Sequence, residues 1–185
     1  MPLGRVRIGA ALLLTLPYVP LLFAGAEWGA SSPFYYFTGH ASRELAGAVR
    51  RGRREEFGHF GWDPKSVPDP QDPATFLASK LDWSERSRES HADVLAWYRE
   101  LLAIRAAMPA LRDGNRAAVV VRHDAVAGWI VVERGPISVA ANLGTQPADV
   151  QMSGELRLAW PPGPERNAGS VRLAPDGVAV AERDA

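Results

Sequence analysis

Val19-Pro-Leu-Leu-Phe-Ala-Gly-Ala-Glu-Trp-Gly29 is the stretch of sequence that decides the fold. Its apolar run at residues 21–24 lies between a proline and a glycine, and this pattern is typical of a strand buried on both faces of a parallel sheet. Such strands carry functional groups just beyond their carboxyl ends, which is where Glu27 and Trp28 stand. We therefore predict one strand of a (β/α) barrel here, with Glu27 as a candidate functional carboxylate.

The composition of the 185-residue chain excludes several classes of protein. Lys+Arg and Asp+Glu both number 21, so no charge excess indicates nucleic acid or an acidic membrane as a partner. Cysteine is absent, which excludes disulfides and thiolate chemistry. A hydrophobic content of 46% is ordinary for a globular protein, and we expect one domain or two small ones.

The N-terminal segment has two interpretations. Two arginines precede an apolar run at residues 8–16, and Ala24-Gly25-Ala26 has the small residues of a cleavage site, as in a secretory signal peptide. The alternative is a helix at residues 6–16 that leads into the strand. Pro17 and Pro20 interrupt the apolar stretch, which favours the helix and disfavours a transmembrane span.

Aromatic residues follow the predicted strand in an unbroken run, Phe34-Tyr35-Tyr36-Phe37. Because neighbouring side chains of an extended segment alternate between faces, these four cannot all enter one core. One interpretation is a hydrophobic plug beneath a loop. The other is a wall on which the apolar faces of sugar rings stack.

The middle of the chain predicts helices joined by an ordered loop. Ser42 is a suitable cap for a helix that ends near residue 57, and the mixed charges of that helix favour a solvated face over a phosphate site. A loop rich in Pro, Gly and Asp covers residues 59–73, and one helical turn follows at residues 74–79. Apolar residues at helical spacing predict the longest helix at residues 90–107.

The last third of the chain predicts an all-β domain. Its short, β-branched, turn-bounded segments are residues 117–122, 126–133, 137–142, 155–160, 170–173 and 177–181. The predicted fold is therefore α/β plus β: residues 1–111 form the last helix, strand and helix of a (β/α)8 barrel, and residues 112–185 form a small antiparallel β-sandwich. The first part has no sheet for its strand to join.

Motifs for catalysis or cofactor binding are scarce. No Gly-rich phosphate loop is present, and the four histidines, at positions 40, 59, 91 and 123, are too dispersed for a metal motif. We expect neither cofactor nor metal. Glu27 is the best-placed carboxylate, since the loop acids at positions 63, 69, 72 and 82 are typical of caps and turns. The residues alone indicate an incomplete enzyme.

The stretch from Leu12 to His40, LLLTLPYVPLLFAGAEWGASSPFYYFTGH, resembles malto-oligosyltrehalose trehalohydrolase, a retaining glycosidase family of the α-amylase superfamily. VPDPQDPATF at residues 67–76 and SKLDW at residues 79–83 are also typical of that family. So is the run from His91 through Trp97-Tyr98 to Arg105. The likeness covers about residues 5–145, and the last forty residues are too generic to compare.

The resemblance implies a position in the family fold. Residues 6–16 would be the seventh barrel helix, residues 21–24 the eighth strand and residues 90–107 the final helix, with the family's C-terminal sandwich after them. Family members carry the first of these helices in the interior of the chain, which disfavours the signal peptide. We accordingly predict a cytoplasmic location.

The resemblance also implies an activity and a site. The family cleaves the α-1,4 bond next to the trehalose end of maltooligosyl trehalose and releases trehalose. Its nucleophilic Asp, general-acid Glu and supporting Asp would lie upstream, so we expect no catalytic residue here. The residues that match the sugar site at the barrel mouth, and that we predict to bind substrate, are Glu27, Trp28, Phe34, Tyr35 and Phe37.

Two departures from the family pattern remove a carboxylate: Ala26 and Gly39 stand where the family has acids. The expected partners are maltooligosyl trehalose or an α-glucan, and the missing N-terminal barrel portion. The alternative is a non-catalytic accessory protein that binds α-glucan or complements another subunit.

Overall fold

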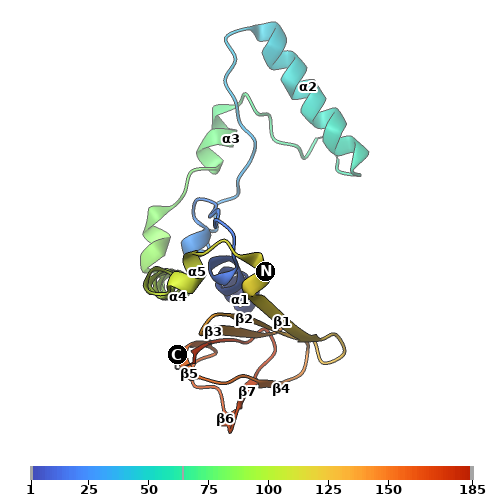
Figure 1. Cartoon of the computed structure of the whole chain (residues 1–185). Helices are drawn as coiled ribbons and strands as arrows, with labels where there is room; N and C mark the ends of the chain where they lie inside the picture. Colours follow the sequence, from blue (N-terminus) through green and yellow to red (C-terminus); the bar gives the residue numbers. More distant parts are fainter. Residues whose placement is uncertain (1, 64, 184–185) are drawn as a thin grey trace. The chain divides into compact units, whose positions relative to one another are not determined.

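The computed structural model describes residues 2–63 and 65–183, and the chain divides into two compact units. Unit 1 takes the residues up to Gly29 and those from Arg86 onward, and unit 2 is Ala30–Glu85 (Figure 1). Unit 2 is therefore a segment inserted within the sequence of unit 1. The predicted boundary between residues 111 and 112 falls inside unit 1, so the division into a barrel piece and a β domain stays a prediction about the family fold.

The helices of unit 1 are α1 (Leu3–Thr15), α4 (Glu89–Ala107) and the short α5 (Pro109–Arg112). The predicted helices at residues 6–16 and 90–107 are confirmed. Helices α1 and α4 contact each other, and Leu14 and Leu101 are among the residues they bury in a shared core. Within the described residues, no helix has the length and apolar character needed to cross a membrane.

The strands of unit 1 form two antiparallel sheets, which confirms the predicted antiparallel β half. One sheet has the order β1-β2-β3-β8-β5, with bounds Val119–Asp124, Trp129–Arg134, Ile137–Asn142, Val178–Glu182 and Glu155–Trp160. The other has the order β4-β7-β6, with bounds Ala148–Gln151, Ser170–Leu173 and Arg166–Asn167. All six predicted strands occur within a few residues of their expected bounds, while β4 and β6 were not predicted. A 3-10 turn, η3 (Arg116–Ala118), leads into β1.

The five-stranded sheet is a middle layer, with helices on one face and the smaller sheet on the other (Figure 1). The side chains of its central strands alternate between the two cores. In β3, Ile137 and Val139 join the core shared with the helices, and Ala140 joins the core between the sheets. In β8, Val180 joins the core shared with the helices, and Ala181 joins the core between the sheets. This alternation explains why every residue of β3 is buried.

The stretch predicted as the eighth barrel strand does not form a strand in this structure, so that prediction is wrong for this chain. Residues 21–23 have no regular secondary structure, and a turn follows at residues 24–25. The physical reason is that this part of the chain has no sheet for the strand to join. A strand is stable only when neighbouring strands form hydrogen bonds with its backbone N–H and carbonyl groups. Leu21 is 88% exposed and Phe23 is 59% exposed, whereas Leu22 between them packs against the core of unit 1.

Unit 2 consists of two helices and extended loops. Helix α2 is Arg43–His59, and the side chain of Ser42 accepts the N–H of Leu45, as the predicted cap requires. Helix α3 is Pro73–Ala78 and is capped by Asp72, and the 3-10 turn η2 (Trp83–Ser87) follows. Both predicted helices are confirmed, and of the predicted loop at residues 59–73 the structure describes all but residue 64.

A buried arginine joins the helices of unit 1 to its sheet. Arg134 of β2 is 2% exposed, and its Nη1 donates to the carbonyl oxygens of Thr15, at 3.0 Å, and Leu111, at 3.2 Å. Burial lowers the pKa of Arg134, the nearby charge of Arg105 lowers it further, and Asp113 opposes the shift. The guanidinium therefore binds the carboxyl end of α1, where carbonyl groups lack helical partners.

We expect Arg134→Ala to lower the free energy of unfolding by about 3 kcal/mol, because two buried carbonyls lose a charged donor. Urea denaturation of both variants measures the effect. Arg172→Ala is the control, since its pair with Asp149 at 2.7 Å is half exposed and contributes only about 0.5 kcal/mol. Equal stability of the two variants would contradict the structural role of Arg134.

Candidate functional site

Glu27 and Trp28 lie in unit 1, in the 3-10 turn η1 (Ala26–Trp28). Glycines with positive φ flank this turn, Gly25 at 90° and Gly29 at 63°, a backbone conformation that glycine adopts without strain. The Glu27 carboxylate accepts the N–H of Gly25 at 3.1 Å. Burial raises the pKa of the Tyr98 hydroxyl, and the neighbouring charge of Glu27 raises it further. Glu27 therefore has a clear local structural role.

Trp28 anchors η1 to helix α4. Its side chain is 1% exposed, and Nδ1 of His91 donates to its carbonyl oxygen at 2.8 Å. A ring so fully covered offers no face to a sugar in this structure. The prediction that Glu27 and Trp28 bind substrate stays a prediction, and the structure shows that both residues stabilise the turn after residues 21–24.

The three predicted aromatic residues lie in unit 2. Phe37 packs edge-on against Phe76, with ring centroids 5.1 Å apart, and against Phe34 at 6.1 Å. The backbone N–H of Tyr35 donates to Oγ of Ser79 at 3.1 Å, which fixes the run beside α3. Phe34 itself is 64% exposed. The run thus places side chains in different environments, as the alternation of faces requires.

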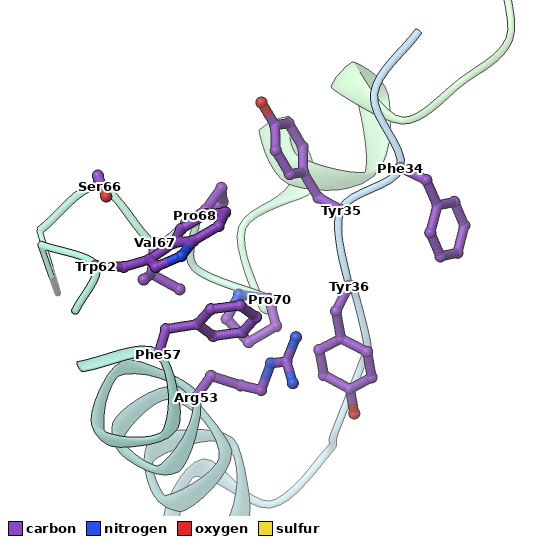
Figure 2. A pocket seen from close by; sticks show the side chains of 10 residues that line it. All are labelled: Phe34, Tyr35, Tyr36, Arg53, Phe57, Trp62, Ser66, Val67, Pro68 and Pro70. Carbon is purple, nitrogen blue, oxygen red and sulfur yellow. The ribbon is translucent and has the colours of Figure 1, made fainter. Parts of the chain in front are cut away.

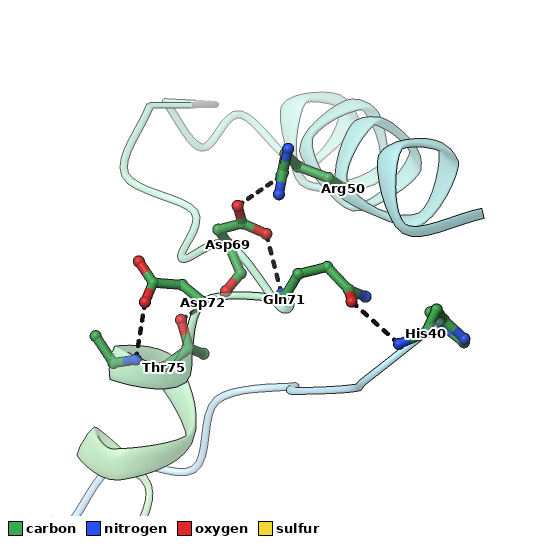
Figure 3. Close-up of polar contacts among 7 residues, drawn as sticks. His40, Arg50, Asp69, Gln71, Asp72 and Thr75 are labelled. Carbon is green, nitrogen blue, oxygen red and sulfur yellow. Dashed lines mark hydrogen bonds and ion pairs between the residues drawn. The ribbon is translucent and has the colours of Figure 1, made fainter. Parts of the chain in front are cut away.

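Polar contacts hold the aromatic run and helix α2 to the proline-rich loop (Figure 3). Asp69 accepts from Arg50 of α2 in an ion pair and from the backbone N–H of Gln71 at 3.0 Å. The side chain of Gln71 in turn accepts the backbone N–H of His40 at 3.3 Å. The hydroxyl of Thr75 donates to the carbonyl oxygen of Asp69 at 2.6 Å. The loop acid Asp69 therefore joins three segments of unit 2.

Further along unit 2, the start of the aromatic run is fixed by a buried carboxylate. Glu85 is 2% exposed and accepts both the backbone N–H, at 3.1 Å, and the hydroxyl of Ser31. The backbone N–H of Thr38 donates to the carbonyl oxygen of Pro70 at 2.8 Å. The run is thus tied at both ends, so its side chains have fixed places.

These contacts frame a pocket of about 430 Å³ in unit 2 (Figure 2). Its lining residues are Phe34, Tyr35, Tyr36, Arg53, Phe57, Trp62, Ser66, Val67, Pro68 and Pro70. Two of them, Phe34 and Tyr35, are among the predicted site residues, whereas the third predicted aromatic residue, Phe37, does not line this pocket. Phe57, Trp62 and Arg53 were not predicted as site residues. For Phe57 and Trp62, aromatic character beside a glycine- and proline-rich loop was the available signal.

Gly39 and Ala26, the two positions that depart from the family pattern, lie in different units. A side chain at Gly39 would meet no atom within 4 Å, so an acid fits there sterically. Ala26 lies in η1 next to Glu27. In the part of the chain that the structure describes, no group of three or more His, Asp or Glu side chains is arranged to hold a metal ion.

Two sequence relatives of the chain have the same name. The chain is 45% identical to "Malto-oligosyltrehalose trehalohydrolase" of Mycobacterium tuberculosis over 85% of its own length and 27% of that protein. It is 44% identical to the protein of the same name from Arthrobacter ramosus, over 96% of the chain and 30% of the relative. The chain corresponds to a C-terminal portion of these relatives and spans under a third of their length.

Solved structures agree with this assignment. A putative α-amylase from Salmonella typhimurium matches with a TM-score of 0.80 and 34% identity over 98% of the chain and 31% of that structure. Trehalulose synthase MutB from Pseudomonas mesoacidophila shares the fold at 18% identity, with a TM-score of 0.60 over 97% of the chain and 38% of that structure. The chain is therefore related to α-amylase-like glycoside hydrolases.

The β half also matches a family model. The model is described as "Domain of unknown function (DUF3459)" and matches residues 114–180. The match to the Arthrobacter relative covers 96% of the chain and so continues into residues 146–185, beyond the range expected from the sequence motifs.

We expect Asp69→Ala to loosen unit 2, because Arg50 and Gln71 lose their common acceptor. Amide hydrogen exchange should become faster in α2 and in residues 66–72, with a loss of about 1 kcal/mol of local stability. Glu55→Ala is the matched control, since it removes an exposed carboxylate from the same helix. Equal exchange rates in both variants would show that Asp69 does not hold the loop.

Proposed function

We propose that this chain supplies a non-catalytic portion of a glycoside hydrolase that cleaves the α-1,4 bond next to the trehalose end of maltooligosyl trehalose. The names of the relatives support the reaction class. Retaining glycoside hydrolysis needs a nucleophilic carboxylate and a second carboxyl group as acid, roughly 5–5.5 Å apart. The family resemblance assigns both groups to strands upstream of this match, so the chain alone is inactive.

The observation that carries this proposal is the row of exposed apolar side chains after α1. Val19 is 94% exposed and Leu21 is 88% exposed, while Leu22 packs against the core of unit 1. One side of the segment therefore covers helices, and the other side is bare. This is the side-chain pattern of a parallel-sheet strand from which the sheet is missing.

Arg105 holds the start of this segment in place. Its guanidinium donates to the carbonyl oxygens of Leu14 at 2.6 Å and Tyr18 at 3.1 Å, and it reaches that of Leu16 at 3.4 Å. The backbone that leads into the bare row is thus fixed before any partner binds. The upstream barrel portion is the partner we propose, with its neighbouring strands pairing along residues 19–23.

The purified chain should release no trehalose from maltooligosyl trehalose. The same chain mixed with an upstream barrel portion of a family member should release it, because the carboxylates and the last barrel segment are then combined. Trehalose quantified over time is the measurement. Turnover by the chain alone would refute the proposal.

We expect Leu21→Asp to abolish this complementation, because a charge on the bare face cannot enter a packed barrel. The readout is trehalose release at a fixed concentration of the barrel portion. Val126→Asp is the matched control, since Val126 is fully exposed in the turn between β1 and β2. Complementation by both variants would contradict the pairing along residues 19–23.

A second candidate is an accessory role in α-glucan binding, which the exposed aromatic side chains of unit 2 favour. Its test is retardation of the chain by soluble starch in a native gel. Tyr35→Ala should reduce the retardation if the aromatic run contacts the glucan, and an unretarded wild-type chain would exclude this role.

A further inference from the structure

A pocket lined by aromatic side chains and by Arg53 lies in unit 2. We infer that it binds a glucose unit of an α-1,4-linked glucan against the exposed rings of Tyr36 and Trp62, with Arg53 as hydrogen-bond donor. The inference rests on the proposed function for the class of sugar. Its volume of about 430 Å³ lies within the range of small-ligand sites, roughly 300–1,000 Å³.

Exposed aromatic faces are the first reason. Tyr36 is 48% exposed and Trp62 is 58% exposed, although both line the pocket. The ring of Trp62 lies against Phe57, with centroids 5.2 Å apart, so its position is supported from one side. The apolar faces of pyranose rings stack on aromatic surfaces of this kind.

Arg53 supplies the polar part of the site. Figure 2 shows its guanidinium between the rings of Phe57 and Tyr36, and Cζ lies 4.6 Å and 4.7 Å from the two ring centroids. The rings fix the plane of the guanidinium, and cation–π contacts of this kind contribute about 0.5–1 kcal/mol at exposed sites. A planar fork of N–H donors in a fixed orientation suits the adjacent hydroxyls of a sugar.

The charges of the site favour a neutral ligand. Nη1 of Arg53 donates to the Glu56 carboxylate at 2.8 Å, so the pair carries no net charge. Arg50, the next arginine on the same side of α2, is paired with Asp69. A pocket for a phosphate would present uncompensated cations. Here the cations that face the loop are compensated, which points to a polyol.

The site is preorganised by the loop beneath it. Val67 and Pro70 are buried and form its floor together with Pro68. The contacts of Asp69 hold this floor to α2, and the N–H of Thr38 bonds the Pro70 carbonyl oxygen at 2.8 Å. Because the prolines and these bonds restrict the loop before a ligand arrives, little ordering cost remains for binding.

Calorimetric titration of the full chain with maltoheptaose tests the inference. We expect binding, and we expect Tyr36→Ala and Trp62→Ala each to weaken the affinity by about tenfold, the loss of one stacking surface. Arg53→Lys keeps the charge but loses the planar fork, and it should weaken binding several-fold. Cellohexaose, with β-1,4 links, should bind more weakly than maltoheptaose.

Tyr18→Ala is the matched control, since Tyr18 is 55% exposed and lies in unit 1, outside the pocket. Circular dichroism verifies that each variant is folded. Absence of maltoheptaose binding by the folded wild-type chain would overturn the inference. So would equal affinities for wild type, Tyr36→Ala and Trp62→Ala.

The two proposals can fail separately. If Trp62→Ala loses maltoheptaose binding and the lone chain hydrolyses substrate, the proposed inactivity of the chain fails and the pocket stands. If complementation with the barrel portion restores trehalose release but no variant of the pocket changes maltoheptaose affinity, the pocket fails and the proposed function stands.

Discussion

Unit 1 depends on the hydrogen bonds that two arginines make with backbone carbonyls at the carboxyl end of α1. Arg134 approaches the Thr15 carbonyl from the sheet, and Arg105 approaches those of Leu14 and Tyr18 from α4. Both complement the negative end of the helix dipole. Burial lowers the pKa of Arg134 most, and the charge of Arg105 lowers it further, so the proximity of the two guanidinium groups has an energetic cost. The two arginines also fix the direction of the chain after α1. This direction sets the position of the exposed apolar row and of η1.

Much of unit 1 could be predicted because its patterns are regular. The six predicted strands are short segments with apolar residues that are bounded by turn residues, and the long helices show apolar residues at helical spacing. Strands β4 and β6 escaped prediction because ADVQ and RN are too short and polar for a pattern. Residues 21–24 have the side-chain pattern of a strand, but this pattern only indicates which side chains would be buried in a complete sheet. It cannot report whether that sheet is present.

The candidate site was predicted less completely, and the reason is tertiary. Phe34, Tyr35 and Phe37 were predicted because they match the sugar site of the family that the sequence resembles, but Phe37 packs on Phe76 and only the first two line the pocket. The opposite wall comes from Arg53, Phe57 and Trp62, which the end of α2 brings to the run. No local pattern links those residues to the run. Trp28 was predicted to bind substrate because it follows the predicted strand and matches the family's sugar site, but its side chain is buried in this structure.

Unit 2 is inserted within the sequence of unit 1, and this affects how the sequence and length of the protein can diverge among relatives. Within unit 1 the contact between His91 and the Trp28 carbonyl closes the chain close to where unit 2 begins and ends. Residues 30–85 therefore form a loop whose two ends are held close together by unit 1. The entropic cost of closing a loop rises only slowly with its length. Insertions and deletions in that loop are nearly neutral for the folding of unit 1. Ligand preference can therefore diverge in unit 2 while the sheets and helices of unit 1 stay unchanged.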